Sequence, residues 1–209
     1  MKSYRAIVYD IDGTLLDTRD RNLYPLLRII EEELGQRWPL ERVLKYTAYS
    51  GMQVMEELGF PDKEKTYARW ARYVNEYDKP AVLYPGFSQV LPAIARAGIL
   101  QAIVSSKMRP QYHIDMAGKG ILPYFTTAVL EEDTALHKPD PAPLLLCLER
   151  LGVAAEDAIY IGDAPSDCLA AKRAGMDFGF AQWGSSLDGI PEQADRILEK
   201  PEDLLQLLK

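Results

Sequence analysis

The sequence has few cysteines, few histidines and no long apolar run, and each scarcity excludes a class of protein. Its 209 residues contain two cysteines, Cys147 and Cys168, both in apolar helical contexts, so we expect buried free thiols in a reducing cytoplasm. His113 and His137 are the only histidines, too few for a zinc site. No apolar stretch approaches the roughly 18–20 residues of a membrane span, and the chain starts without the apolar core of a signal peptide. We therefore expect a cytoplasmic protein without a membrane partner.

Positive charge is scarce as well. The chain has 24 lysines and arginines against 31 aspartates and glutamates, which gives a formal net charge of −7. A protein that binds the phosphate backbone of nucleic acid shows a basic stripe, so we expect no nucleic acid partner. A small phosphorylated substrate is still compatible, because a bound metal and one or two lysines set the local field. The length suits one core domain with an inserted subdomain, as a monomer or a homodimer.

Apolar strand-like runs alternate with helical patterns, which is typical of parallel βαβ units. We therefore expect an α/β fold with a doubly wound, mainly parallel sheet, a Rossmann-like core. The expected strands are 4–10, 99–104, 126–130, 157–161 and 177–181, and the expected core helices are 86–97, 109–118, 141–151, 165–174 and 201–208. Gly98, Gly152 and Gly175 each follow a predicted helix, where a left-handed residue ends it.

Residues 16–80 break this alternation. Leucine and isoleucine recur at helical spacing from Leu23 to Leu34, and no strand is expected in the segment. Further helical patterns lie around 39–48, 51–58 and 62–77. Turn signals from Lys79-Pro80 onward lead back to the core. We predict a catalytic core of residues 1–15 and 81–209, with residues 16–80 as an inserted α-helical cap domain.

Two acids follow the first apolar run at a spacing of two residues. The run ends at Asp10, Asp12 follows, and Gly13 and Thr14 turn the chain. Because side chains alternate faces along a strand, Asp10 and Asp12 can point the same way at its end. Two such carboxylates repel each other unless a proton or a divalent cation neutralises them. The carboxyl end of a parallel strand is also where open α/β sheets bind ligands, so the pair predicts a site there.

Further polar residues follow the later strand-like runs. Ser105 and Ser106 can hold a phosphate oxygen beside backbone N–H groups, although paired serines are also common helix N-caps. Lys138 precedes Pro-Asp-Pro, a stiff backbone that suits an ammonium aimed inward. Asp163 ends a strand-like run, where metal binding is the better interpretation. Asp167 falls in the first turn of the next helix, where an acid is favourable even without a ligand.

In chain order, Asp-x-Asp-Gly-Thr, Ser-Ser-Lys, Lys-Pro and Gly-Asp-x-x-x-Asp resemble the four motifs of the haloacid dehalogenase-like phosphohydrolases. The resemblance spans residues 4–181. The helical insert after the first motif is similar to the cap of the subgroup that contains phosphoglycolate phosphatases, pyrophosphatases and β-phosphoglucomutases. The resemblance implies a Mg²⁺-dependent phosphatase that hydrolyses a small phosphorylated metabolite through an aspartyl-phosphate intermediate.

The same resemblance implies a role for each acid. Asp10 is the expected nucleophile, and Asp12 is the expected general acid and base. Mg²⁺ is expected to bridge Asp10, the backbone carbonyl of Asp12, Asp163 and the substrate, because it prefers hard oxygen ligands. Asp167 is expected to orient Asp163 or a metal-bound water.

The resemblance assigns the substrate's phosphoryl oxygens to Lys138 and Ser105, supported by Ser106 and by backbone N–H groups near Ile11 and Gly13. Substrate choice is expected to lie in the cap. The candidate residues sit at a break between cap helices, and they are Tyr46, Tyr49, Ser50, Gly51 and Gln53.

Three alternatives stay open beside the phosphatase. A phosphomutase would use the same aspartyl-phosphate but shield it from water; the resembling mutases usually have Val or another β-branched residue where Thr14 stands, which favours a hydrolase modestly. A haloacid dehalogenase is disfavoured because those relatives lack the second acid, here Asp12, which a halide leaving group does not need. An inactive binding module on the same fold is disfavoured because every expected catalytic position is filled.

Overall fold

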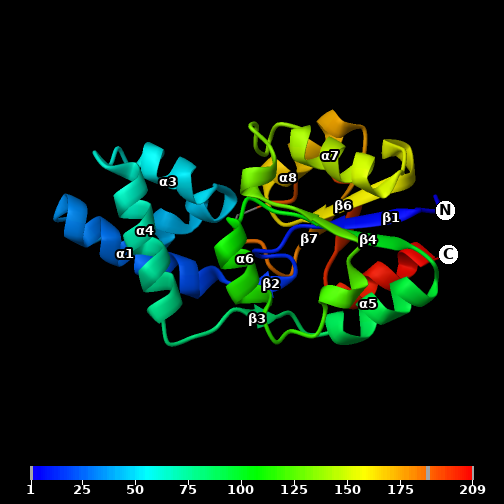
Figure 1. Cartoon of the computed structure of the whole chain (residues 1–209), viewed down its shortest axis with the longest axis horizontal. Coiled ribbons are helices and arrows are strands. Elements are labelled where there is room, and N and C mark those ends of the chain that lie inside the picture. The colour runs from blue at the N-terminus through cyan, green and yellow to red at the C-terminus, as the bar shows by residue number, and fades with distance from the viewer. Residues whose placement is uncertain (1, 187–188, 209) are drawn as a thin grey trace.

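The sheet is wound in both directions from its first strand (Figure 1). The computed structural model describes residues 2–186 and 189–208, and six strands of this part form one sheet in the order β5-β4-β1-β6-β7-β8. Every neighbouring pair is parallel. The strands are β1 (Ala6–Tyr9), β4 (Leu100–Val104), β5 (Thr127–Val129), β6 (Ala158–Gly162), β7 (Asp177–Ala181) and β8 (Arg196–Leu198). The winding reverses between β1 and β6, and at such a point the connections leave a crevice beyond the strand ends.

Helices cover both faces of this sheet (Figure 1). Alternation along β1 sends Ile7 and Tyr9 to one face and Ala6 and Val8 to the other. The first face packs against α5 (Phe87–Arg96), α6 (Arg109–Met116) and the 3₁₀ helix η5 (Pro201–Leu208), and the second against α7 (Ala142–Leu151) and α8 (Pro165–Ala174). Three short 3₁₀ turns complete the core, η2 (Leu122–Tyr124), η3 (Glu131–Asp133) and η4 (Ala155–Asp157). The expected doubly wound α/β fold is confirmed.

In the core, one sequence expectation is met and one strand was missed. Gly152 and Gly175 end α7 and α8 in the left-handed conformation, with φ of 63° and 78°, as expected. The strand β8, however, was not expected from the sequence. Its three residues are too short to show a periodicity, and Ile197 is half exposed at the edge of the sheet.

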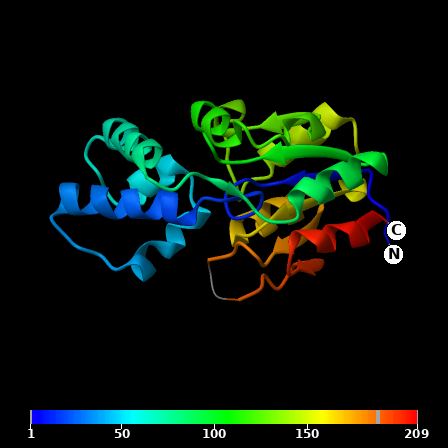
Figure 2. The ribbon, with the colours of Figure 1, turned by 90° about the horizontal axis from the view of Figure 1, so that it is seen from below.

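The segment after β1 forms a separate helical layer beyond the carboxyl ends of the strands, opposite the two chain termini (Figures 1 and 2). It contains α1 (Arg19–Leu34), α2 (Leu40–Val43), η1 (Leu44–Ala48), α3 (Gly51–Glu57) and α4 (Lys63–Glu76). These helices bury a cluster of their own, which includes Leu26, Ile30, Val54 and Phe60. Apolar side chains therefore hold this layer together independently of the sheet.

The expectation of no strand in residues 16–80 is wrong at one end of that range. β2 (Leu16–Asp17) pairs antiparallel with β3 (Val82–Leu83), so the two connections to the helical layer run side by side. Two residues carry too little pattern to reveal a strand in the sequence. Among residues 2–186 and 189–208, no helix is long and apolar enough to cross a membrane.

Candidate active site

Sequence-predicted residues meet at the carboxyl end of the sheet. Asp10 directly follows β1, Ser105 follows β4, and Asp163 follows β6, so the strands place all three at one edge. Lys138 comes from the loop before α7, and Asp167 lies in the first turn of α8. All five are buried. Buried charges need partners, so their contacts decide what this edge can do.

Asp10, Asp163 and Asp167 form an acidic cluster in which carboxylate oxygens lie within 4.8 Å of one another. Burial, together with the nearby carboxylates of Asp167 and Asp12, raises the pKa of Asp10 to about 7, although Lys138 opposes the shift. Burial and the neighbouring acids also hold the pKa of Asp163 well above its usual range. The positive charge near the Asp10 and Asp163 carboxylates is therefore too small to balance them. A hard divalent cation bound there would supply the missing charge.

Asp167 differs from the other two acids because the protein uses both of its oxygens. Oδ1 accepts a hydrogen bond of 2.6 Å from Lys138 Nζ, and Oδ2 accepts one of 3.1 Å from the backbone N–H of Ala164. By contrast, Oδ1 of Asp10 is buried without a hydrogen bond, and Lys138 Nζ lies 3.1 Å from it as an ion pair. The donor set thus fits a metal held by Asp10 and Asp163, with Asp167 supporting it through Lys138 and the α8 backbone.

Lys138 is directed inward, as its stiff Pro-Asp-Pro context suggested. Its ammonium donates to the hydroxyl of Tyr160 at 3.0 Å, and that hydroxyl donates to the carbonyl of Val104 at 2.9 Å. Although burial alone would lower its pKa, the carboxylates of Asp10 and Asp167 raise the pKa of Lys138 well above its usual range. The lysine is therefore a fixed positive charge beside Asp10.

Asp12 has a different environment from Asp10. Its Oδ1 accepts hydrogen bonds from Thr18 Oγ1 and from Asn22 Nδ2 (3.5 Å), and Lys107 Nζ lies 3.0 Å from the same atom. Burial raises the pKa of Asp12, but Lys107 and Thr18 outweigh it and lower the pKa below its ordinary value. Sequence reasoning gave no role to Lys107, Thr18 or Asn22. Lys107 stood within the Ser-Ser-Lys motif, which was the available signal.

The turn that carries Asp12 packs tightly against Asp163. Gly13 has φ of 73°, and a Cβ there would lie 2.3 Å from Asp163 Oδ2. On its other side, a Cβ at Gly184 would lie 1.7 Å from the Gly13 carbonyl oxygen. Thr14 Oγ1 donates to Asp163 at 3.3 Å, and Trp183 Nε1 donates to the Thr14 carbonyl at 2.9 Å. Glycine at 13 and 184 is therefore required by space, and Thr14 orients Asp163.

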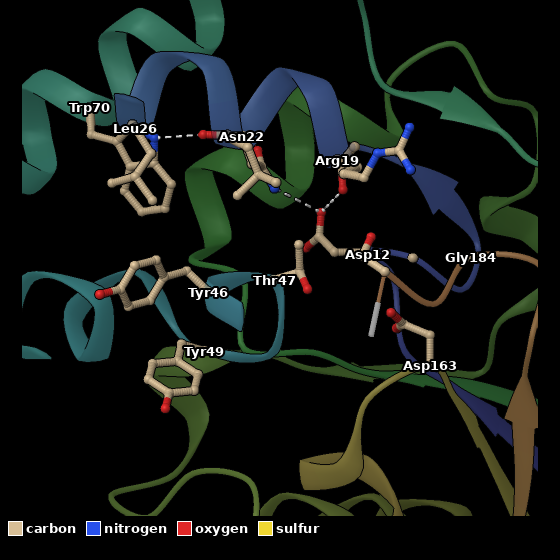
Figure 3. A pocket seen from close by; sticks show the side chains of 14 residues that line it. Asp12, Arg19, Asn22, Leu26, Tyr46, Thr47, Tyr49, Trp70, Asp163 and Gly184 are labelled. Atoms are coloured by element: carbon tan, nitrogen blue, oxygen red, sulfur yellow. Dashed lines mark hydrogen bonds between the residues drawn. The ribbon is translucent and has the colours of Figure 1, made fainter. Parts of the chain in front are cut away.

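Four cavities meet at this edge, and one of them, of about 80 Å³, is lined by Asp12, Lys107 and Trp70 among others. A small pocket of about 50 Å³ is lined by Asp10, Asp12, Ser105, Ser106, Lys138 and neighbours from the helical layer. A chamber of about 70 Å³ lies beyond Asp12 and Asp163, and its far wall carries Tyr46 and Trp70 (Figure 3). A wider cleft of about 550 Å³ opens between α3 and α8. Tyr49 lines all four.

The other cap residues singled out in the sequence have different positions. Ser50 is buried and forms a capping box at the start of α3, in which its hydroxyl accepts from the N–H of Gln53. The Gln53 side chain accepts in return from the N–H of Ser50 and also borders the wider cleft. Ser50 therefore has a local structural task, whereas Tyr49, 41% exposed, faces the cavities.

The fold, the four motifs and this cluster define a hydrolase class. The chain belongs to the haloacid dehalogenase-like hydrolases, whose family model matches residues 7–181. It is 32% identical to a phosphoglycolate phosphatase of Xanthomonas campestris over 98% of this chain and 96% of the relative. It is 28% identical to the pyrophosphatase PpaX of Bacillus velezensis over 99% and 97% of the two chains.

A solved structure gives the same assignment. The crystal structure of a candidate phosphoglycolate phosphatase from Lactobacillus plantarum superimposes with a TM-score of 0.90 at 28% identity, over 98% of this chain and 99% of that one. These comparisons confirm the expected family, the expected fold and the expected enzyme class, a phosphatase among the haloacid dehalogenase-like hydrolases.

Proposed function

We propose that the protein hydrolyses a small phosphorylated metabolite in two steps, with Asp10 as the nucleophile. The observation that carries the proposal is a buried carboxylate, Asp10, beside a fixed ammonium, Lys138, on the wall of a pocket of about 50 Å³. A cavity of that size holds a few water molecules, roughly the bulk of one phosphoryl group. Ser105 and Ser106 line the same pocket, and their hydroxyls are candidate donors to the phosphoryl oxygens.

In the first step, a carboxylate oxygen of Asp10 forms a bond to phosphorus while the bond to the leaving oxygen breaks. The leaving alkoxide takes a proton from Asp12, which lines both the small pocket and the adjoining chamber. Because Asp12 is ionised in the free protein, it receives this proton from the phosphate ester monoanion as the substrate binds and places negative charge beside it. In the second step, Asp12 takes a proton from water, which attacks the aspartyl-phosphate and releases inorganic phosphate and Asp10. Lys138 and the two serines hold the non-reacting oxygens throughout.

Asp10 and Asp163, with the backbone carbonyl of Asp12, are the groups that we propose would hold Mg²⁺. The bound cation would supply positive charge to the Asp10 carboxylate and to the phosphoryl oxygens. Asp167 would keep Lys138 and the start of α8 in place, since its two oxygens are engaged there. Thr14 would keep Asp163 aimed at the cluster through its hydroxyl.

The size of the chamber supports a small leaving group. About 70 Å³ lies between Asp12 and the aromatic wall of Tyr46 and Trp70 (Figure 3). A leaving group of a few heavy atoms, such as the glycolate or phosphate that the relatives' names indicate, would fill this space. Arg19 borders it and offers a cation for such an anion.

We also propose that residues 16–80 act as a cap on a core of residues 1–15 and 81–209. The helical layer has its own buried cluster, and its two connections pair as β2 and β3, which form a single narrow neck. Such a lid would exclude bulk water from the small pocket when it is closed. The buried thiols of Cys147 and Cys168 support a reducing compartment, the cytoplasm, as its location.

The test is phosphate release from a panel of small phosphate monoesters, with and without Mg²⁺. The intermediate is tested by acid quench followed by borohydride, which converts an acyl phosphate at Asp10 to homoserine that peptide mass spectrometry detects. Phosphate release with a modified Asp10 peptide supports the proposal. Isomerisation of a sugar phosphate with little free phosphate would instead make the protein a mutase.

A further inference from the structure

A line of buried charges leads from Asp12 to the helical layer. Lys107 Nζ lies 3.0 Å from Asp12 Oδ1 and donates to Asp115 Oδ2 at 2.6 Å. Asp115 lies in α6, and its other oxygen is 3.2 Å from Arg21 of α1. The charges therefore alternate in sign along Asp12, Lys107, Asp115 and Arg21.

These side chains are shielded from solvent, with exposed fractions of 5% for Lys107, 1% for Asp115 and 10% for Arg21. Buried ions depend on their partners, because water does not screen them and removal of one leaves the next uncompensated. A surface ion pair would contribute little and would have little influence on its neighbours. The contacts along this line are therefore coupled.

Arg21 also connects two helices of the helical layer. Its guanidinium donates to the carbonyl of Val74 at 3.1 Å and to Asn75 Oδ1 at 3.0 Å, both in α4. Gln111 of α6 donates to Asn75 at 3.1 Å and to Asp115 at 2.8 Å. The position of α1 and α4 on the core is thus tied to Asp115 by several hydrogen bonds.

We propose that Arg21 and Asp115 are positioning residues that hold Lys107, and through it the carboxyl of Asp12, in place when the helical layer is docked on the core. This inference rests on the proposed function, which makes Asp12 the proton donor to the leaving group. The contacts of Thr18, Asn22 and Lys107 reach Oδ1 of Asp12, so they fix the direction in which the other oxygen faces. Asp115 keeps the Lys107 ammonium within reach of that atom.

In variants of Arg21 or Asp115, we expect kcat/KM to depend more steeply on the pKa of the leaving group than it does in the wild type. A dinitrophenolate leaves without a proton, whereas a phenolate or alkoxide requires one, so misplacing the donor slows only the second kind. The value of kcat/KM covers the steps up to transfer of the phosphoryl group to Asp10, which separates this role from the later attack by water.

The experiment compares substituted phenyl phosphates, from 2,4-dinitrophenyl to phenyl, and the best alkyl phosphate of the panel. Arg21→Met and Asp115→Asn should each lower kcat/KM for phenyl and alkyl phosphates about tenfold or more, a part of the about 10²–10⁴-fold that general acid catalysis supplies. The value for the dinitrophenyl ester should fall less than about threefold. Arg21→Lys, which keeps the charge, should restore part of the loss.

The matched control is Arg69→Met, which breaks ion pairs to Glu32 and Glu33 within the helical layer and touches no part of the line. It should leave the leaving-group dependence unchanged. Because Arg21 acts through Asp115, Arg21→Met in the Asp115→Asn background should cause little further loss. If Asp115→Asn does not fold, Arg21→Met and Gln111→Leu carry the same comparison.

An equal fall for every leaving group would overturn the positioning role, and so would additive losses in the double variant. Asp12→Asn is the reference that separates this failure from a failure of the proposed function. A steep dependence in Asp12→Asn but not in Arg21→Met would reject the inference alone. A flat dependence in Asp12→Asn would reject Asp12 as the proton donor and the inference with it.

Discussion

The acidic edge of the sheet has two halves that differ in charge compensation. Asp10 and Asp163 are buried, whereas the side chain of Asp12 is 28% exposed. In the half around Asp10 and Asp163, acids outnumber the lysine available to them, and the pKa of Asp10 rises to about 7. In the half around Asp12, the Lys107 ammonium and the Thr18 hydroxyl outweigh the effect of burial and lower the pKa of Asp12. Two carboxylates of one motif therefore have opposite pKa shifts, because the lysines are placed differently around them.

The largest effect is expected when the carboxylate of Asp10 is neutralised. Asp10→Asn should lower the hydrolysis of phenyl phosphate by about 10⁴-fold or more, because loss of a covalent nucleophile removes a whole pathway. The measurement is phosphate release with Mg²⁺ present. Asp17→Asn, an exposed carboxylate seven residues away, is the matched control and should retain nearly full activity. A rate above about 1% of wild type in Asp10→Asn would contradict the nucleophile assignment.

Lys138 should come next in size. Lys138→Met should depress kcat/KM for all substrates by a similar factor of about 10²–10³, since each of them presents the same phosphoryl group to the ammonium. Lys45→Met, at the rim of the wide cleft, is the control and should affect substrates unequally. A loss at Lys138 that varied widely with the leaving group would show that this lysine contacts more than the phosphoryl oxygens.

The raised pKa of Asp10 also predicts that the unfolding free energy depends on pH. Since the pKa of Asp10 is raised to about 7 in the folded state, that state keeps a proton between about pH 4 and pH 7 that the unfolded chain has lost. The metal-free protein should therefore lose about 2–4 kcal/mol of unfolding free energy as the pH rises through this window. Urea unfolding in chelator at several pH values measures it.

Two controls belong to that experiment. Mg²⁺ should flatten the slope and stabilise the protein by about 2.7 kcal/mol at a hundredfold excess over its dissociation constant, because it binds the ionised folded form. Asp10→Asn should reduce the slope in chelator. Acids with lowered pKa values, such as Asp12 and Asp177, titrate below this window and do not contribute to it. A metal-free stability that increased from pH 4 to pH 7 would contradict the charge assignment.

Tyr49 tests the division between the core and the helical layer. It lines the small pocket, the chamber and the wide cleft without belonging to the acidic edge. Tyr49→Ala should change the ratio of kcat/KM between a small and a bulky phosphate ester by about tenfold, while phenyl phosphate hydrolysis falls less. Equal losses for all substrates would assign Tyr49 to the chemistry rather than to selection.

The sequence predicted what depends on short-range order and missed what depends on distant partners. Asp10, Ser105 and Asp163 were predictable because each ends an apolar strand, and parallel strands bring such ends together. Lys107 stood within a recognised motif, yet its direction is set by a pair of acids, Asp115 in the next helix and Asp12 in the first motif, and the second of these is far from it in the chain. No local pattern carries that information.

Ser50 illustrates the same limit from the other side. Its place at a break between helices suggested substrate contact, but the same Ser-x-x-Gln spacing is also a capping box, and the structure has the box. The three-dimensional structure distinguishes Ser50, which is buried in the capping box, from its neighbour Tyr49, which is 41% exposed and lines the cavities. The sequence identified the correct loop and could not identify which of its side chains faces inward.

The smallest expected effect follows from that distinction. Ser50→Ala removes the hydroxyl that caps α3 and so should lower the unfolding free energy by about 1 kcal/mol, as N-cap losses do. Its substrate ratios should match those of the wild type, in contrast to Tyr49→Ala. Urea unfolding and the same two-substrate comparison measure both properties. Ser50→Thr, which keeps a capping hydroxyl, should recover most of the stability. If Ser50→Ala changed the substrate ratio as much as Tyr49→Ala, the loop would select substrate as a unit, and the purely structural role of Ser50 would be wrong.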